Sequence, residues 1–371
     1  MHLSEAATPA LVLDRGKLER NCERMLARAR SLGTRLRPHM KTLKAIDAAR
    51  VAIDPRHGGI AVSTLKEAGY FAGHGISDIQ YAVCITPDKL PQAAAIAARA
   101  PGFGAFIDSV DLARALADYP QIAAWIEIDS GEHRTGIAPD DPRLIEIAAI
   151  LRDAAVPLAG VATHGGHSYG ERTPEGIAAV AEQERVAVVG AAERLRAAGF
   201  EVPGVSAGST PTSVHRASAE DLTELRAGVY MAGDLFQSGI GSLAEGEIAV
   251  SVLASVIAHK PEQNQIVVDA GGLALSKDRS TAALAGGDLG YGLVLDIDGE
   301  PGFGRLTVAG VSQEHGVIRG LAPLPFDRLP IGARVRILAN HVCMTAAIHE
   351  SYLIVDGGGE IVDRWDKLVG W

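Results

Sequence analysis

Short apolar runs alternate with helical patterns through the first two thirds of the chain. Eight such runs lie near residues 35–41, 59–63, 78–85, 102–108, 123–129, 159–164, 204–209 and 225–230. Strands that alternate with helices are typical of parallel strands joined by crossover connections. Because the unit recurs eight times, the pattern predicts an α/β fold of the TIM-like (β/α)8 barrel type.

Two of the helical patterns carry clear local signals. Leu18, Cys22, Met25 and Ala29 recur at helical spacing before the first barrel strand, which predicts an amphipathic helix with Cys22 in its apolar face. A longer helix is expected between residues 173 and 199, because Thr173 can cap it and Pro174 suits its first position.

The pattern changes after about residue 241. Strand-like runs separated by glycine and proline turns lie at residues 247–260, 264–272, 292–297, 305–311, 333–343 and 351–365. We therefore expect an all-β domain over residues 242–371, after a barrel domain over residues 1–241. A cleft between two such domains is a natural place for a ligand.

Composition excludes several classes of protein. The chain has 371 residues, of which 47% are hydrophobic and 22% charged, and it has neither a long apolar run nor a secretory signal pattern. Its net charge of -10 comes without a basic stripe, which argues against nucleic acid as a partner. Three cysteines cannot form a disulfide framework. We expect a cytoplasmic protein that acts on a small molecule and not at a membrane.

Candidate chemistry lies where the predicted barrel strands end, since the carboxyl ends of the strands carry the active site in such barrels. The polar residues found there are Lys41, His164, His167, Ser209, Thr210 and Tyr230. A lysine can act as nucleophile and base when its surroundings lower its pKa, although most lysines in loops are simply solvated. The segment AGSTPT after the seventh run offers backbone N–H groups and hydroxyls to a phosphate. Together, a lysine after the first strand and an anion cradle after the seventh suggest pyridoxal phosphate.

The chain is similar to the fold-type III pyridoxal-phosphate enzymes, and within them to the D-serine dehydratase and D-threonine aldolase group. The motifs that carry the resemblance are TPALVLDRGKLERN, RPHMKTLK, GGIAVSTLKEAGYFA, GGHSY, GSTPT, SQEHG, NHVCMTAAIHESYLIV and the terminal VGW. The resemblance implies that Lys41 holds the cofactor covalently, that Gly208, Ser209 and Thr210 form the phosphate loop, and that Tyr169 lies near the pyridine ring. It also implies that Tyr230 forms part of the cofactor-site wall and that the protein is a homodimer.

His341 and Cys343 belong to the motif HVC, which matters most for choosing between possible reactions. On a strand these two residues would point to the same face, where a nitrogen and a sulfur could bind one divalent cation. A buried cysteine beside a hydrogen-bonded histidine is the ordinary alternative. The family places a metal on this His-x-Cys pair, or on His-x-Asp in related aldolases. The cysteine favours zinc, and manganese stays open.

The resemblance implies a lyase for D-β-hydroxy amino acids. We expect a D-serine dehydratase type of reaction, in which water is eliminated and a 2-oxo acid and ammonia are released. A D-threonine aldolase is the main alternative, because His167 occupies a position at which the aldolases carry a catalytic base. An amino-acid racemase and a non-catalytic cofactor carrier are further alternatives. The preferred substrate stays open among D-serine, D-threonine and D-3-hydroxyaspartate.

Overall fold

A computed structural model describes residues 1–320 and 322–371. The chain forms two compact units. The first, here called the barrel unit, contains Glu23–Lys41, Ala52–Gly228 and Trp371. The second, the β unit, contains Met1–Cys22, Thr42–Val51 and Val229–Gly370. The predicted division after residue 241 gives each domain one continuous stretch, whereas these units are interleaved, and the chain passes from one to the other between Lys41 and Thr42.

The barrel unit is built on parallel strands. In the described part of the chain they are β2 (Arg35–Pro38), β3 (Ile60–Val62), β4 (Ile79–Cys84), β5 (Gly104–Ile107), β6 (Ala123–Glu127), β7 (Leu158–Ala162), β8 (Gly204–Ala207) and β9 (Glu224–Ala227). They pair in the order β2-β9-β8-β7-β6-β5-β4-β3. An isolated parallel bridge between His39 and Ala61 connects the two ends. All eight predicted strands and the TIM-like barrel are therefore confirmed.

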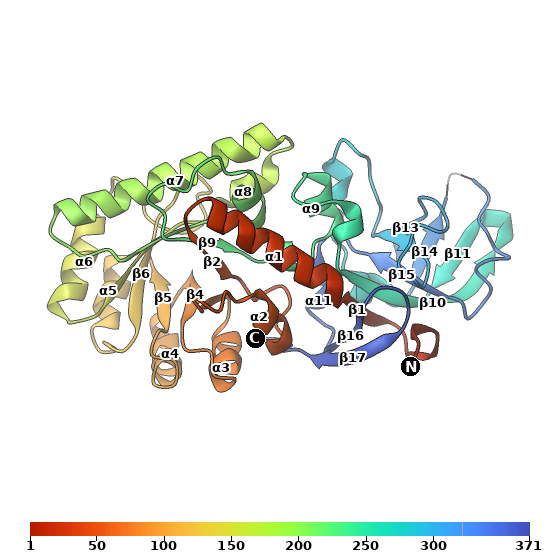
Figure 1. Ribbon diagram of the computed structural model, residues 1–371, viewed down its shortest axis with the longest axis horizontal. Coiled ribbons are helices and arrows are strands. Elements are labelled where there is room, and N and C mark those ends of the chain that lie inside the picture. The colour runs from red at the N-terminus through yellow and green to blue at the C-terminus, as the bar shows by residue number, and fades with distance from the viewer. Residues whose placement is uncertain (321) are drawn as a thin grey trace. The chain divides into compact units, whose positions relative to one another are not determined.

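Helices connect and surround these strands, and Figure 1 shows α3 to α7 on the outside of the barrel strands. The α-helices are α1 (Arg15–Ser31), α2 (Ile46–Ala52), α3 (Leu65–Gly73), α4 (Leu90–Ala97), α5 (Val110–Leu116), α6 (Arg143–Asp153), α7 (Pro174–Ala197), α8 (Thr210–His215), α9 (Leu235–Gly239), α10 (Gly272–Leu275) and α11 (Val342–Ala346). The predicted cap of α7 is present, since the Thr173 hydroxyl accepts the Gly176 N–H at 3.1 Å. None of the described helices is both long and apolar enough to span a membrane.

The predicted apolar face of α1 is also present. Leu18, Cys22, Met25 and Ala29 are all buried, so Cys22 is an ordinary core residue. Burial of one face, rather than intrinsic propensity alone, is what stabilises most helices of this kind in proteins.

A charged network occupies the barrel unit next to its apolar core. Glu224 on β9 accepts hydrogen bonds from Arg37 at 3.0 Å and from Ser206 at 2.7 Å. Arg37 also donates to Asp78 at 2.7 Å. Arg37, Glu224 and Ser206 are buried, and buried charges persist only when they are paired and hydrogen-bonded. The arginine of the RPHMK motif is therefore held by a carboxylate on the neighbouring strand.

The β unit contains a largely antiparallel sheet. Its strands are β1 (Ala10–Asp14), β10 (Val250–Lys260), β11 (Gln265–Val268), β12 (Leu293–Leu295), β13 (Thr307–Val311), β14 (Gly316–Arg319), β15 (Arg334–Leu338), β16 (Ser351–Val355) and β17 (Ile361–Asp366). Their order is β11-β14-β13-β12-β15-β10-β1-β16-β17, and β11 also pairs with β10. That extra pairing closes the strands from β10 to β15 into a small barrel. The predicted all-β C-terminal region is confirmed.

Three features of the β unit differ from the prediction. The N-terminal strand β1 joins this sheet between β10 and β16. Strand β14 lies in a segment where no strand was predicted. The run at residues 333–343 is a strand only as far as Leu338, and its last part turns into helix α11.

Candidate active site

Lys41 lies in a turn of the barrel unit, three residues beyond the last residue of β2. The strand was expected to reach Lys41, but it ends at Pro38 and continues only as the single bridge at His39. The Lys41 side chain is exposed, and its backbone N–H donates to Nδ1 of His39 at 3.4 Å. A turn at a strand's carboxyl end allows this lysine to reach a ligand at the barrel mouth.

Two histidines lie in the electrostatic environment of Lys41. Burial, followed by the charge of Lys41, lowers the pKa of His39 well below its ordinary value. The same two causes lower the pKa of His164 to about 3. Nδ1 of His164 donates to the Gly208 carbonyl at 3.1 Å, which connects the end of β7 with the loop after β8. Both imidazoles are therefore neutral near pH 7, and Lys41 lies in the vicinity of residues that follow β2 and β7.

The Gly208–Thr210 loop has the backbone geometry of a close-approach site. Gly208 has φ +124°, and a Cβ there would lie 2.8 Å from the Arg226 carbonyl oxygen, so only glycine fits. Ser209 is the N-cap of α8: its hydroxyl accepts the Thr212 N–H at 3.2 Å, and its own N–H donates to the Thr212 hydroxyl at 2.8 Å. The Ser209 side chain is thus used within the loop, and Thr210 is the buried first residue of the helix.

The loop with the sequence THGGHSY is joined to the Gly208–Thr210 loop. It contains the 3-10 helix η3 (Gly166–Gly170), which includes Tyr169. The Ser168 hydroxyl lies 3.3 Å from the Ser209 hydroxyl. His167 points elsewhere, because its Nε2 bonds the side-chain oxygen of Gln183 on α7 at 3.0 Å. The structure therefore brings Tyr169 and Ser209 into adjacent segments and ties His167 to the long helix.

A buried ion pair on α7 supports the same loop. Glu184 accepts the Gly165 N–H at 2.6 Å and pairs with Arg216 at 2.6 Å. Both charged side chains are almost fully buried. Sequence reasoning missed Glu184 because it lies within an ordinary helical pattern, where a glutamate normally faces solvent. The one sequence signal that could have identified Glu184 was its position on the side of the helix that also carries the buried apolar residues.

Tyr230 belongs to the β unit, whereas the other predicted cofactor-binding residues belong to the barrel unit. It lies in the 3-10 helix η4 (Val229–Met231) and not at the end of β9, which stops at Ala227. Burial raises the pKa of Tyr230 well above its ordinary value, and Cys22 adds to this effect. Tyr230 is therefore a buried residue near Cys22 of the same unit.

The HVC motif lies at the beginning of a helix and not on a strand. His341 has extended backbone angles and is the N-cap of α11, and Cys343 lies in its first turn. The prediction that a strand aligns the two side chains was wrong, because Asp234 accepts the Val342 N–H at 3.1 Å and so stabilises the start of a helix here. The two side chains nevertheless meet, since His341 is hydrogen-bonded to Cys343.

Two carboxylates accompany this pair. Nδ1 of His341 lies 3.4 Å from Asp278. Burial alone would lower the pKa of His341, but its hydrogen bonds to Asp278 and Cys343 raise it to about 10. The bond with His341 lowers the pKa of Asp278 to about 2. Burial raises the pKa of Asp234 to about 6. A cation that binds this imidazole must displace a proton from it.

Thr42 also touches the pair. Its hydroxyl lies 3.1 Å from Sγ of Cys343. Among the described residues, no group of three or more His, Cys, Asp or Glu side chains is arranged to hold a metal ion. His341 and Cys343 therefore offer one nitrogen and one sulfur, a donor set that suits zinc, and further ligands would have to be water or substrate oxygens.

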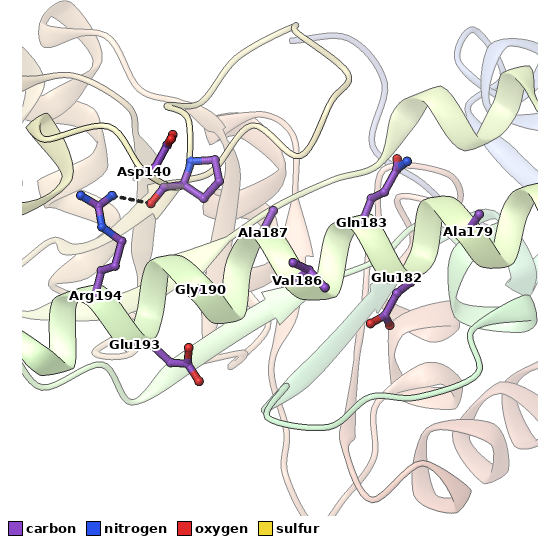
Figure 2. A pocket seen from close by; sticks show the side chains of 10 residues that line it. Asp140, Ala179, Glu182, Gln183, Val186, Ala187, Gly190, Glu193 and Arg194 are labelled. Atoms are coloured by element: carbon purple, nitrogen blue, oxygen red, sulfur yellow. Dashed lines mark hydrogen bonds between the residues drawn. The ribbon is translucent and has the colours of Figure 1, made fainter.

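A surface pocket lies along α7, and Gln183, the hydrogen-bond partner of His167, is among the residues that line it. Figure 2 shows the side chains that line it. Arg194 donates to the Pro139 carbonyl at 2.6 Å. The wall includes Glu182, Glu193 and Asp140 and contains no lysine. This acidic wall does not suit a phosphate-bearing cofactor, and none of the predicted site residues lines it.

Comparisons with known proteins agree with this architecture. Residues 13–235 match the family described as alanine racemase, N-terminal domain, and residues 249–355 match the putative serine dehydratase domain. The D-threo-3-hydroxyaspartate dehydratase of Delftia sp. (strain HT23) is 43% identical over 376 residues, which cover 98% of each chain. The D-serine dehydratase of Dictyostelium discoideum is 29% identical over 98% of this chain and 97% of its own.

Solved structures give the same result. The Delftia enzyme matches with a TM-score of 0.92 at 42% identity over 100% of both chains. A mutant D-threo-3-hydroxyaspartate dehydratase, described as the metal-free form, gives a TM-score of 0.93 at 41% identity, again over all of both chains. The D-threonine aldolase of Filomicrobium marinum gives 0.82 at 26% identity, over 98% of this chain and 96% of that one. The chain therefore belongs to the fold-type III pyridoxal-phosphate-dependent lyases, in the family that contains the D-serine dehydratases and D-threonine aldolases.

Proposed function

We propose that this protein eliminates water from D-β-hydroxy amino acids and releases a 2-oxo acid and ammonia. The observation that carries the proposal is the hydrogen-bonded pair of His341 and Cys343, a nitrogen and a sulfur that can bind one cation. The Delftia dehydratase, at 43% identity over nearly the whole chain, supports elimination of water as the reaction type.

The barrel unit suits pyridoxal phosphate. Lys41 would bind the cofactor's aldehyde through its amine, and the backbone N–H groups of the Gly208–Thr210 loop would bind the phosphate. The fit rests on Gly208, where a Cβ would meet the Arg226 carbonyl at 2.8 Å, so the backbone there stays open to a ligand. When bound, the cofactor supplies an electron sink for the bonds at the substrate's Cα.

Lys41 would have a second role. When its amine is free, it would take the proton from the substrate's Cα as a general base. The imidazoles of His39 and His164 are neutral and add no positive charge beside this amine. His341 and Cys343 would hold a divalent cation, whose chemistry is to polarise the β-hydroxyl as a leaving group.

The reaction type leaves open which side chain the preferred substrate carries. The sequence favoured D-serine, whereas the relative at 43% identity acts on D-threo-3-hydroxyaspartate and the D-serine dehydratase of Dictyostelium discoideum is only 29% identical. We therefore rank D-threo-3-hydroxyaspartate first and D-serine second. Elimination of water gives oxaloacetate from the first and pyruvate from the second, each with ammonia.

An aldolase is the second candidate, and His167 is the observation that favours it. The Gln183 oxygen can only accept, so Nε2 of His167 carries the proton and Nδ1 keeps the lone pair. Nδ1 has no hydrogen-bond partner among the described residues. An imidazole with a free basic nitrogen could take the proton from a β-hydroxyl, so that the Cα–Cβ bond breaks and glycine and an aldehyde form.

One experiment separates these reactions. The protein is loaded with pyridoxal phosphate and Zn²⁺, then incubated with D-threo-3-hydroxyaspartate, D-serine or D-threonine, with and without EDTA. The 2-oxo acid, ammonia, aldehyde and glycine are measured separately. Chelator-sensitive oxaloacetate or pyruvate with equal ammonia supports the dehydratase. Glycine with an aldehyde replaces it with the aldolase, and racemisation without ammonia contradicts both.

A further inference from the structure

We propose that Asp278 and Thr42 are positioning residues for the proposed cation pair. Asp278 fixes the ring of His341, and Thr42 fixes the sulfur of Cys343. This inference rests on the proposed function, because it assumes that the pair binds a cation. It adds two residues that come from segments far from the HVC motif in sequence.

The contact of Asp278 with His341 selects which ring nitrogen is free. Oδ2 of Asp278 lies 3.4 Å from Nδ1 of His341. A carboxylate can only accept, so Nδ1 donates its proton to Asp278, and Nε2 is the nitrogen that a cation can bind once it has displaced the proton there. Histidines that bind metals generally donate their other nitrogen to an acceptor in this way, which fixes both the tautomer and the ring orientation.

Asp278 is itself held rigidly. Its Oδ1 accepts the Ser280 N–H at 2.8 Å, and its backbone carbonyl accepts the Asn340 side-chain amide at 2.8 Å. Asn340 directly precedes His341, so the loop around Asp278 is bonded to the segment that it orients. The neighbouring Arg279 pairs with Asp288 and leaves the Asp278 carboxylate to the histidine.

Thr42 occupies a comparable position on the sulfur side. Its side chain is buried, and its hydroxyl lies 3.1 Å from Sγ of Cys343. The next residues are anchored within the β unit: the Tyr352 hydroxyl donates to the Leu43 carbonyl at 3.0 Å, and the Leu368 N–H donates to the Lys44 carbonyl at 2.8 Å. A buried hydroxyl at this distance restricts where the sulfur can lie, and so fixes the position of a cation ligand.

Thr42 also directly follows Lys41 in the chain. The segment that carries the proposed cofactor lysine is therefore fastened, one residue later, to the cysteine of the proposed cation pair. Thr42 would therefore link the turn that carries Lys41 to Cys343. A threonine that only caps a helix or fills the core would not have this role.

The test measures cation binding by the full-length protein after removal of metal. Zn²⁺ is titrated calorimetrically into the wild type and into the variants Asp278→Asn, Thr42→Val and Thr42→Ser. Asp278→Asn keeps an oxygen for the Ser280 N–H but loses the charge that holds the Nδ1 proton. We expect Asp278→Asn and Thr42→Val to weaken Zn²⁺ binding by about 10–100-fold. Thr42→Ser should bind like the wild type, because it keeps the hydroxyl.

Co²⁺ gives a second readout, because its absorption spectrum reports contact with the Cys343 sulfur. Thr42→Val should change the sulfur-to-cobalt band, and Thr42→Ser should restore it. Asp288→Asn is the matched control, since Asp288 is part of the same loop region but pairs with Arg279. Melting curves show whether each variant is folded.

The outcomes separate the two proposals. If the wild type and His341→Ala both fail to bind Zn²⁺, the cation site of the proposed function is lost and this inference with it. If the wild type binds and His341→Ala does not, while Asp278→Asn and Thr42→Val bind like the wild type, only the positioning inference is overturned.

Discussion

Arg37 and Glu224 face each other inside the barrel unit, with the Arg37 Nε 3.0 Å from the Glu224 carboxylate and both side chains shielded from water. Arg37 stands four residues before Lys41, so this pair anchors the strand that leads to the proposed cofactor lysine. The pair joins β2 to β9, which are also neighbours through their backbone ladder.

Replacing Glu224 with Gln should destabilise the protein strongly. The substitution leaves the buried Arg37 without its full charge partner, and breaking a buried ion pair on one side costs about 3–5 kcal/mol. We expect a lower urea midpoint and a lower melting temperature. Glu193→Gln, on the exposed side of α7, is the matched control and should leave both unchanged within experimental error.

Acid should remove the contribution of Glu224. Burial alone would raise its pKa, but Arg37 and Arg35 lower the pKa to about 2, from an ordinary value of 4.5. The unfolded chain therefore binds the proton more readily, so this stabilisation is complete above pH 4.5 and is lost as the pH falls towards 2. Urea unfolding measured from pH 7 to pH 3 should show this loss in the wild type. The loss should be smaller in Glu224→Gln, and an equal loss in both proteins would contradict the assignment.

Gly208→Ala should harm both folding and cofactor retention. A Cβ at φ +124° is strained, and it would lie 2.8 Å from the Arg226 carbonyl, so we expect a cost of about 1–3 kcal/mol. Equilibrium dialysis should show weaker retention of pyridoxal phosphate. Gly190→Ala, on α7, is the control, because a Cβ at Gly190 would have no atom within 4 Å. Alanine should stabilise this helix by about 0.5–1 kcal/mol. Normal cofactor retention by Gly208→Ala would remove this loop from the proposed site.

Lys41→Ala should abolish the visible absorption of the bound cofactor and all turnover, because it removes the amine that would bind the aldehyde. Lys66→Ala, on the exposed face of α3, should change neither. Spectra and product assays on both variants check this. Visible absorption that persists in Lys41→Ala would assign the covalent link to another lysine.

His167→Ala should distinguish the two lyase reactions. If the protein is a dehydratase, water elimination should fall less than tenfold, since His167 is bonded to Gln183 on α7 and has no role in taking the Cα proton. If the protein is an aldolase, loss of this base should lower aldehyde release by about 10²–10⁴-fold. Parallel assays of 2-oxo acid and aldehyde decide between them.

The sequence alone predicted the strands that alternate with helices and the loop chemistry between them. The eight barrel strands, the apolar face of α1 and the Thr173 cap of α7 follow from local spacing, and each is present. Lys41 after β2 and Gly208 after β8 could be singled out for the same reason. Parallel strands bring their carboxyl ends together, so residues at those ends can be grouped without coordinates.

Only the tertiary structure revealed the partners that hold these groups in place. Thr42 contacts Cys343, which lies 301 positions further along the chain. Asp278 contacts His341 from a loop, where no helix or strand periodicity predicts which way a side chain points. The HVC segment was predicted as a strand because its apolar run continues β15, but a side chain from Asp234 binds the Val342 N–H and supports a helix instead. Local spacing determines which face of an element is apolar. Contacts between distant segments depend on how the whole chain packs, and they decide where a carboxylate or hydroxyl meets a ligand residue.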